Sequence, residues 1–246
     1  IRFKEKFISY GDLVGIAKII NHSLKEILLL SSNKRIALYA KKTITYYASL
    51  LACENEKACF VPLHPSFPKN RLGSICNISC CETLICSDED LADLEYLLYN
   101  YSIKQIISLN ERTQKIKIFR NLSIEKKFFD SKNLNTKSKI IDEAYVLFTS
   151  GSTGIPKGIS ISRINLYNYL NNIKNVVKVS STDNLTHLFE LSFDLSIHDI
   201  YITLLNGATL CIPTKSDLLL PVNYISRNQI SIWFSVPSFI ANMEKL

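Results

Sequence analysis

Residues 145–158 read Tyr-Val-Leu-Phe-Thr-Ser-Gly-Ser-Thr-Gly-Ile-Pro-Lys-Gly, and the interpretation of the whole chain starts from them. An apolar run ends in a loop of hydroxyl residues and glycines, and a lysine closes the loop. The chain holds 7 glycines, and three of them, Gly151, Gly154 and Gly158, lie here. Glycine lets backbone N–H groups converge on an anion because no Cβ stands in the way. The stretch therefore predicts a strand that leads into an anion-binding loop.

The side chains of this loop indicate which anion it suits. Hydroxyl groups donate hydrogen bonds, and a lysine adds a fixed positive charge. We therefore predict a polyphosphate site at Thr149, Ser150, Gly151, Ser152, Thr153, Gly154 and Lys157. A flexible Ser/Gly linker is the plainer interpretation, but the strand-like run before the loop and the rigid ring of Pro156 disfavour it. A Walker-type loop is excluded, because that pattern ends in Gly-Lys followed by Ser or Thr, whereas Lys157 precedes Gly158.

The segment 148–158 resembles the phosphate-binding loop of adenylate-forming enzymes. That superfamily includes acyl-CoA synthetases, luciferases, adenylation domains of nonribosomal peptide synthetases and D-alanine–carrier-protein ligases. The resemblance implies that the loop binds the triphosphate of ATP. It also implies Mg²⁺ as a cofactor, with its main ligand expected beyond residue 246, and it gives no metal ligand within the chain.

Composition limits the other function classes. Of the 246 residues, 47% are hydrophobic and 21% are charged, which suits an α/β domain with a full core. No apolar run approaches the roughly 18 residues of a membrane span, and no signal-peptide pattern opens the chain. The 7 cysteines lack zinc-site spacing, so we expect reduced, buried thiols in a cytoplasmic protein. The net charge of +7 favours anionic partners, but no nucleic-acid reader module is visible.

Strand-like and helical segments alternate along the chain. Strand patterns cover residues 35–40, 59–63, 82–86, 104–109, 144–148, 158–162, 185–189 and 208–212. Helical patterns cover residues 9–28, 43–54, 88–99, 165–177 and 196–205. Residues 111–141 read as a surface connection with short strand-like runs at 115–119 and 127–130. This order predicts an α/β fold with a mostly parallel sheet flanked by helices on both faces, without repeats or a domain linker.

Residues 60–68 carry three prolines and predict a rigid turn before a helix. They resemble the Val-Pro-Leu-Asp-Pro-x-x-Pro segment of the same superfamily, in the version typical of members that activate amino acids. Arg71 stands where an arginine usually follows. His64 replaces the usual aspartate, and we expect it to be a surface or packing residue.

A second informative stretch is Phe-Glu-Leu-Ser-Phe-Asp-Leu-Ser-Ile-His-Asp-Ile-Tyr at residues 189–201. Asp194 lies where a helix begins, so one interpretation is a helix cap. The run Phe193-Asp194-x-Ser196 also resembles the Phe-Asp-x-Ser motif of amino-acid adenylation domains. The resemblance implies that Asp194 holds the α-ammonium group of a substrate, which suits a carboxylate in a partly dry pocket. We expect His187 and His198 to be structural.

The resemblance covers residues 1–246 but only the first half of the family pattern. We therefore expect an incomplete N-terminal adenylation domain, with the C-terminal domain absent and the catalytic residues unknown. The implied function is ATP-dependent activation of an amino acid as an aminoacyl-adenylate, followed by transfer to the phosphopantetheine thiol of a carrier protein. Two alternatives stay open: a ligase that activates acyl or aryl acids, and a non-catalytic truncated remnant. The side chain and stereochemistry of the substrate, the carrier protein and the oligomeric state are not specified.

Overall fold

The computed structural model describes residues 1–246 except 4–5, 32, 121–141, 150–154 and 244–246. The described chain forms two compact units. Unit 1 comprises residues 1–12 and 167–246, and unit 2 comprises residues 13–166. The boundaries fall within two helices, α1 (Tyr10–Leu30) and α7 (Arg163–Val176), and for that reason no linker composition marks them. None of the described helices is both long and apolar enough to cross a lipid bilayer.

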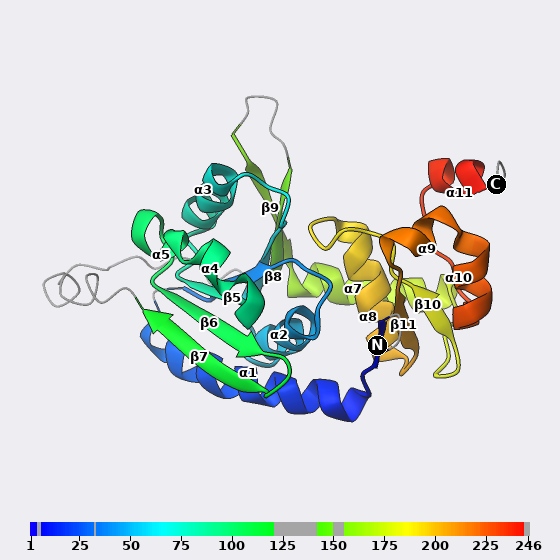
Figure 1. Cartoon of the computed structure of the whole chain (residues 1–246), viewed down its shortest axis with the longest axis horizontal. Coiled ribbons are helices and arrows are strands. Elements are labelled where there is room, and N and C mark those ends of the chain that lie inside the picture. Colours follow the sequence, from blue (N-terminus) through cyan, green and yellow to red (C-terminus); the bar gives the residue numbers. More distant parts are fainter. Residues whose placement is uncertain (4–5, 32, 121–141, 150–154, 244–246) are drawn as a thin grey trace, which may run out of the picture. The chain divides into compact units, whose positions relative to one another are not determined.

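Unit 2 is built on a seven-stranded sheet in the order β7-β6-β5-β3-β4-β8-β9 (Figure 1). The five inner strands are parallel, and β7 and β9 pair antiparallel at the two edges. The strands are β3 (Arg35–Tyr39), β4 (Cys59–Leu63), β5 (Thr83–Ser87), β6 (Gln105–Asn110), β7 (Lys115–Arg120), β8 (Glu143–Thr149) and β9 (Lys157–Ser162). The inner strands are buried and rich in apolar residues, as strands covered on both faces must be.

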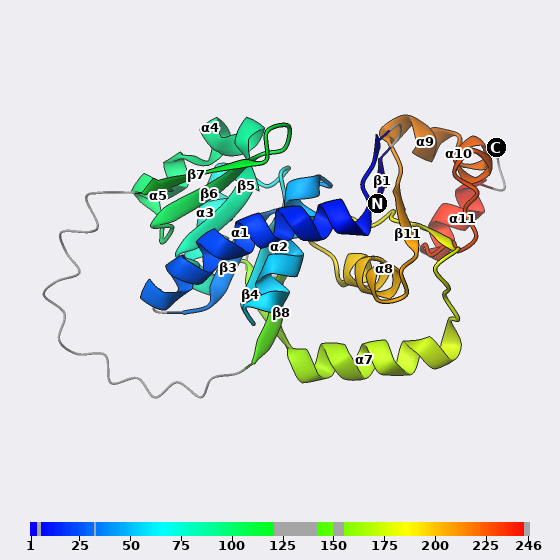
Figure 2. The same ribbon diagram turned by 90° about the horizontal axis from the view of Figure 1, so that it is seen from below.

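Helices cover both faces of this sheet (Figure 2). One face carries α2 (Ile44–Asn55) and the part of α1 from Leu13 onward. The other face carries α3 (Lys69–Ser79), the 3₁₀ turn Asp88–Asp90, α4 (Leu91–Leu94) and α5 (Tyr96–Asn100). Side chains alternate between the faces along each strand. Ala37, Val61 and Leu84 pack in one core cluster with Leu72 and Ile75 of α3.

Unit 1 contains a four-stranded sheet in the order β10-β11-β1-β2. Its strands are β1 (Arg2–Phe3), β2 (Lys6–Phe7), β10 (Asn184–Thr186) and β11 (Thr209–Ile212). The helices of this unit, besides parts of α1 and α7, are α8 (Asp194–Leu205), α9 (Lys215–Leu219), α10 (Pro221–Asn228) and α11 (Pro237–Met243). The hydroxyl of Tyr10 donates to the carbonyl oxygens of Thr203 and Ala208, at 3.1 and 2.8 Å. These bonds fix the connection between α8 and β11.

The structure confirms the predicted α/β fold with mostly parallel strands flanked by helices. The strands are divided between two sheets. The structure also contains short elements that the sequence analysis does not predict: β1, β2, α9, α10 and α11. The predicted helix 88–99 is wrong as one element. The amide of Leu98 donates to the carbonyl of Glu95, a three-residue step that interrupts the α-helical pattern. The run 115–119 is confirmed within β7, and the run 127–130 lies outside the described residues.

The seven cysteines all lie in the described part of the chain and all are free thiols. Six of them are buried, as expected, and Cys80 is exposed. Cys80 ends α3 with a left-handed backbone, φ 55°, which turns the chain and its side chain outward. Burial raises the pKa of the Cys76 thiol to about 12, so this thiol stays protonated near neutral pH.

Candidate functional site

The loop predicted to bind phosphate connects β8 and β9, which form an antiparallel hairpin at the edge of the unit 2 sheet. Thr149 is the last residue of β8 and lies opposite Lys157, the first residue of β9. The hydroxyl of Thr149 donates to the carbonyl oxygen of Lys157 at 3.5 Å. The other five predicted residues lie outside the described part of the chain: Ser150, Gly151, Ser152, Thr153 and Gly154. We call Thr149 and Lys157 the hairpin tip.

The side chains of the hairpin tip are both exposed. Within the described ranges the amine of Lys157 has no acidic partner, so no ion pair neutralises its charge there. The backbone next to it is held closely. A Cβ on Gly158 would lie 2.9 Å from Cζ of Phe148 and 3.1 Å from Cγ1 of Val146. Glycine is therefore required at position 158 for packing against Phe148, a role that the sequence reading did not separate from the anion loop.

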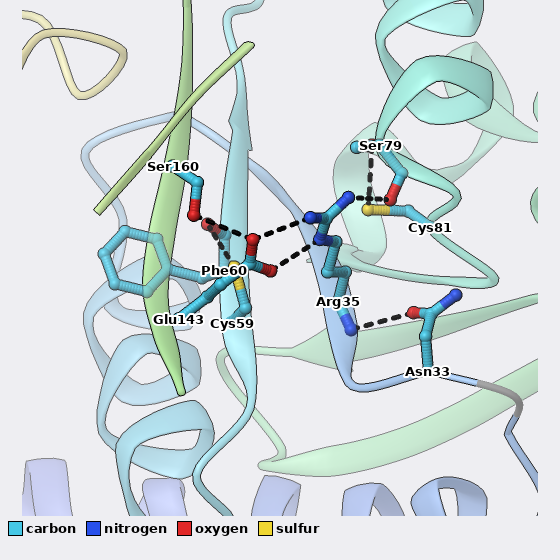
Figure 3. A network of polar contacts seen from close by, with 8 residues as sticks. All are labelled: Asn33, Arg35, Cys59, Phe60, Ser79, Cys81, Glu143 and Ser160. Atoms are coloured by element: carbon cyan, nitrogen blue, oxygen red, sulfur yellow. Dashed lines mark hydrogen bonds and ion pairs between the residues drawn. The ribbon is translucent and has the colours of Figure 1, made fainter. Parts of the chain in front are cut away.

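The opposite end of the hairpin is fixed by an ion-pair network (Figure 3). Nε and Nη2 of Arg35 donate to the two carboxylate oxygens of Glu143, each at 2.7 Å. The hydroxyl of Ser160 donates to Glu143 at 2.7 Å, and Nη1 of Arg35 donates to the carbonyl of Ser79 at 3.2 Å. Hydrogen bonds from Arg35 are the main reason that the pKa of Glu143 is lowered. We call Arg35, Glu143 and Ser160 the hairpin base.

Arg163 secures the chain directly after β9. Its guanidinium pairs with Glu54, donates to the carbonyl of Ala58 at 2.7 Å and lies 3.1 Å from the carboxylate of Asp142. The amide of Arg163 also donates to the carbonyl of Asp142 at 2.8 Å. Both strands of the hairpin are therefore anchored at the end remote from the loop.

The second candidate residue, Asp194, is the first residue of α8 in unit 1. The N-cap is Phe193, and it makes no side-chain capping bond. The carboxylate of Asp194 is exposed and accepts no hydrogen bond among the described residues, so the helix-cap interpretation finds no support. The hydroxyl of Ser196 makes the local bond instead and donates to the carbonyl of Phe193 at 2.6 Å. Asp194 is therefore left available for another partner.

An aromatic group in unit 1 surrounds His198, which lies four positions after Asp194 on α8 and therefore on the same helix face. The hydroxyl of Tyr169 and Nδ1 of His198 are 2.7 Å apart, and the rings of His198 and Phe234 are centred 4.4 Å apart. The ring of Phe189 lies 5.3 Å from that of Phe234. Burial is the main reason that the pKa of Tyr169 is raised, and the negative charges of Asp194 and Asp199 raise it further. We call Tyr169, Phe189, His198 and Phe234 the aromatic group.

His198 is 8% exposed, and burial lowers its pKa, so the ring is neutral near pH 7. The sequence reading expected His198 to be structural and did not find Tyr169, Phe189 or Phe234 as its neighbours. No local pattern could have shown this, because Tyr169 and Phe234 come from segments 65 positions apart and meet only through the fold. His187, also expected to be structural, is fully buried with Nδ1 3.2 Å from the carboxylate of Asp199.

Comparison with known families decides the class of the chain. A model of the family described as AMP-binding enzyme matches residues 1–245. The chain belongs to the AMP-binding enzyme family. The match extends through both units and includes the hairpin tip and Asp194, so the resemblance inferred from the loop is confirmed for the described fold as a whole.

Curated relatives of this AMP-binding chain include peptide synthetases and a carrier-protein ligase. Bacitracin synthase 1 of Bacillus licheniformis is 29% identical over 206 residues, which cover 83% of this chain and 3% of that protein. The L-proline–[L-prolyl-carrier protein] ligase of Pseudomonas fluorescens is 29% identical over 221 residues, covering 85% of this chain and 41% of the ligase. The chain therefore spans less than half the length of either relative.

Solved structures share the fold. The chain superposes on IdnL7 with a TM-score of 0.77 at 24% identity, covering 98% of this chain and 47% of that one. It superposes equally well, at TM-score 0.77 and 24% identity, on the Vibrio cholerae adenylation domain AlmE in complex with glycyl-adenosine-5'-phosphate. That match covers 98% of this chain and 46% of AlmE. At this level of identity the superpositions establish the architecture.

Proposed function

We propose that this chain takes part in the ATP-dependent activation of an amino acid and in its transfer to a carrier protein. In the first step a carboxylate oxygen of the amino acid attacks the α-phosphorus of ATP, and the bond to pyrophosphate breaks. In the second step the sulfur of a phosphopantetheine thiol attacks the acyl carbon. The thiol gives up its proton and AMP leaves. The proposal concerns the whole protein, of which residues 1–246 would form the first part of an N-terminal adenylation domain.

In this proposal the hairpin tip and its loop hold the triphosphate. Lys157 would offset the negative charge that collects as pyrophosphate leaves, and Thr149 would donate a hydrogen bond. The remaining contacts are assigned to Ser150, Gly151, Ser152, Thr153 and Gly154. The chemistry of the donors supports the assignment, because the amine of Lys157 is exposed and has no carboxylate partner in the described ranges. A lysine already paired with a carboxylate would be a poor phosphate ligand.

Mg²⁺ would neutralise phosphate oxygens in the same reaction. The described residues contain no group of three or more His, Cys, Asp or Glu side chains suited to hold a metal ion. The family resemblance implies a main magnesium ligand beyond residue 246, and we propose that the ion is held mainly there. The chain's own contribution to phosphate binding would come from N–H, O–H and ammonium donors.

The observation that carries the amino-acid assignment is the state of Asp194. Its carboxylate is exposed, makes no capping bond and lies on the same face of α8 as His198 of the aromatic group, four positions later. A carboxylate beside a partly apolar aromatic group suits an ammonium ion, since charge-assisted hydrogen bonds strengthen where water is excluded. The neutral ring of His198 adds no competing positive charge. Asp194 would therefore hold the α-ammonium group of the substrate.

A ligase for acyl or aryl acids is the nearest alternative, and the aromatic group gives it some support. The edge-to-face pair of Tyr169 and His198 and the tilted pair of His198 and Phe234 would suit an aryl acid as well as an amino acid. The two proposals differ in the role of Asp194. An amino acid provides an ammonium group that neutralises the carboxylate, whereas an acyl or aryl acid without an amino group does not. Burying an unpaired carboxylate against such a substrate is costly.

Exchange of radiolabelled pyrophosphate into ATP, measured on the protein purified from its own cells, tests the proposal. Each amino acid is compared with the matching carboxylic acid that lacks the amino group. We expect exchange with at least one amino acid and at least a tenfold lower rate with its deaminated partner. Equal rates would favour the acyl- or aryl-acid alternative. ATP binding without exchange for any acid would favour the non-catalytic remnant.

A further inference from the structure

Arg71 is a partly buried arginine whose guanidinium has no hydrogen-bond acceptor among the described residues. It lies in the first turn of α3, and its guanidinium carbon is 4.1 Å from the centre of the Phe67 ring. Nε of Arg71 is buried and has no hydrogen-bond partner in the described part of the chain. The partly buried Arg35 and Arg163, in contrast, each pair with a glutamate. Arg71 is therefore held by stacking on Phe67 and has no counterion in the part of the chain that the structure describes.

The helix that carries Arg71 also provides no negative charge near it. The first turn of α3 contains no acidic residue, and the N-cap, Pro68, provides no side-chain bond. Lys69 in the same turn lies over the Tyr96 ring, with its amine 5.0 Å from the ring centre. Helix N-termini favour anions, so two cations in a first turn are unfavourable unless an anion joins them.

The fold brings this turn to the same edge of the sheet as the hairpin tip. Strands β4 and β8 are parallel neighbours with Phe60 beside Tyr145. Three further residues take β4 to Leu63 and β8 to Phe148. The turn that begins at His64 and the loop that follows Thr149 therefore leave the sheet at adjacent strand ends.

Packing links the same two segments. Phe148 belongs to the core cluster of unit 2, and Phe67 packs against that cluster. The ring of Phe67 is in turn 5.2 Å from the ring of His64, whose Nδ1 accepts a hydrogen bond from the amide of Ser66 at 3.2 Å. These contacts hold the turn that carries Phe67, and the guanidinium of Arg71 stacks on that ring. Helix α3, which follows the turn, lies against β9, the strand that begins at Lys157.

We propose that Arg71 is a further binding residue for the polyphosphate, acting with Lys157 from the neighbouring strand end. The inference rests on the proposed function, since it assigns Arg71 to the same anion. A guanidinium suits this task because its planar donors match phosphate oxygens, and stacking on an aromatic ring fixes its orientation. Binding would supply the acceptor that the buried Nε lacks.

The test uses inorganic tripolyphosphate as the probe and isothermal calorimetry on the full protein. In Arg71→Met, which keeps the packed stem and removes every donor, we expect about tenfold weaker binding. Lys157→Met reports on the proposed function and is expected to weaken binding as well. Arg112→Met is the matched control, because Arg112 is exposed on the turn between β6 and β7. It should bind tripolyphosphate as the unaltered protein does.

Thermal unfolding separates binding from a structural role. Without ligand, Arg71→Met should unfold at the same temperature as the unaltered protein or higher, because an unpaired buried donor has been removed. With tripolyphosphate it should show a smaller rise in Tm. A lower Tm without ligand, together with a normal ligand-induced rise, would assign Arg71 to stability and overturn the inference.

Arg71→Lys keeps the charge and loses the planar donors, so it should bind tripolyphosphate more weakly than the unaltered protein. Equal binding would also overturn the inference.

The outcomes distinguish the inference from the proposed function. Normal binding in Arg71→Met with weak binding in Lys157→Met would overturn the inference and leave the function standing. Normal binding in Lys157→Met would contradict the phosphate assignment of the loop. It would also overturn the inference for Arg71, which rests on that assignment. Weak binding in both variants, with normal binding in Arg112→Met, would support both.

Discussion

The two ends of the β8–β9 hairpin differ in how their charges are used. At the hairpin base, Arg35 and Glu143 neutralise each other through two hydrogen bonds of 2.7 Å, and Ser160 adds a third. At the hairpin tip, Lys157 is exposed and has no acidic partner in the described ranges. The contrast indicates that the base stabilises the fold and that the tip is free to bind. Rigid support at one end also positions the donors at the other.

The largest effect on stability should come from breaking the hairpin base. Glu143→Ala removes the acceptor of two Arg35 donors and leaves a partly buried guanidinium unpaired. The side chain of Arg35 is 32% exposed and that of Glu143 is 10% exposed, so water recovers part of the loss. We expect the free energy of unfolding to fall by roughly 2 kcal/mol, measured by urea denaturation. Glu89→Ala, at an exposed carboxylate, is the control and should change it by less than about 0.5 kcal/mol.

The next largest effect should come from Gly158→Ala. The added Cβ would lie 2.9 Å from the Phe148 ring, so the ring or the strand must move. We expect a loss of about 1–2 kcal/mol in urea denaturation. Gly15→Ala is the matched control, because its Cβ would meet nothing within 4 Å and alanine favours the helix. If both variants were equally stable, close packing of Phe148 against β9 would be refuted.

Acid should weaken the hairpin base in a defined direction. The pKa of Glu143 in the folded protein lies below the ordinary value of 4.5 for a glutamate, chiefly because Arg35 donates to the carboxylate. A depressed folded pKa contributes stability that is present above the unfolded pKa and is lost as pH falls through the folded value. The stability difference between the unaltered protein and Glu143→Gln should therefore be constant from pH 7 to about 5 and shrink below pH 4. A difference that grows on acidification would contradict the ion pair.

The smallest effect on stability should come from the hairpin tip. Lys157→Gln removes an exposed charge without a described acidic partner. We expect the free energy of unfolding to change by less than about 0.5 kcal/mol in urea. A loss comparable to that of Glu143→Ala would show that Lys157 stabilises the fold, and the contrast between the two ends would be lost.

Much of the fold could be predicted from the sequence because its signals are local. The buried strands of unit 2, such as Cys59–Leu63, are continuous apolar runs. Helix α8 ends at Leu205, and Gly207 follows two residues later with a φ of +68° that only glycine adopts readily. The hairpin around the loop followed from the apolar runs on either side of it. The short strands β1 and β2 have two residues each and carry no periodic signal.

The rest of the site could not be predicted because it depends on contacts between distant residues. Arg35 and Glu143 are 108 positions apart and meet because β3 and β8 flank β4. The neighbours of His198, Tyr169 and Phe234, likewise come from separate segments of unit 1. The missing acceptor of Arg71 is visible only once burial is known. Asp194 could be selected from the sequence, but its failure to cap α8 could not.

The most direct test of the proposed function is amino-acid-dependent ATP–pyrophosphate exchange in Asp194→Asn. Asp93→Asn is the matched control, because Asp93 is also exposed and lies on α4 of the other unit. We predict that Asp194→Asn lowers the exchange rate with the preferred amino acid at least a hundredfold, since the ammonium group loses its counterion. Asp93→Asn should leave the rate unchanged. Undiminished exchange in Asp194→Asn would contradict the assignment of this carboxylate to the substrate and with it the amino-acid specificity.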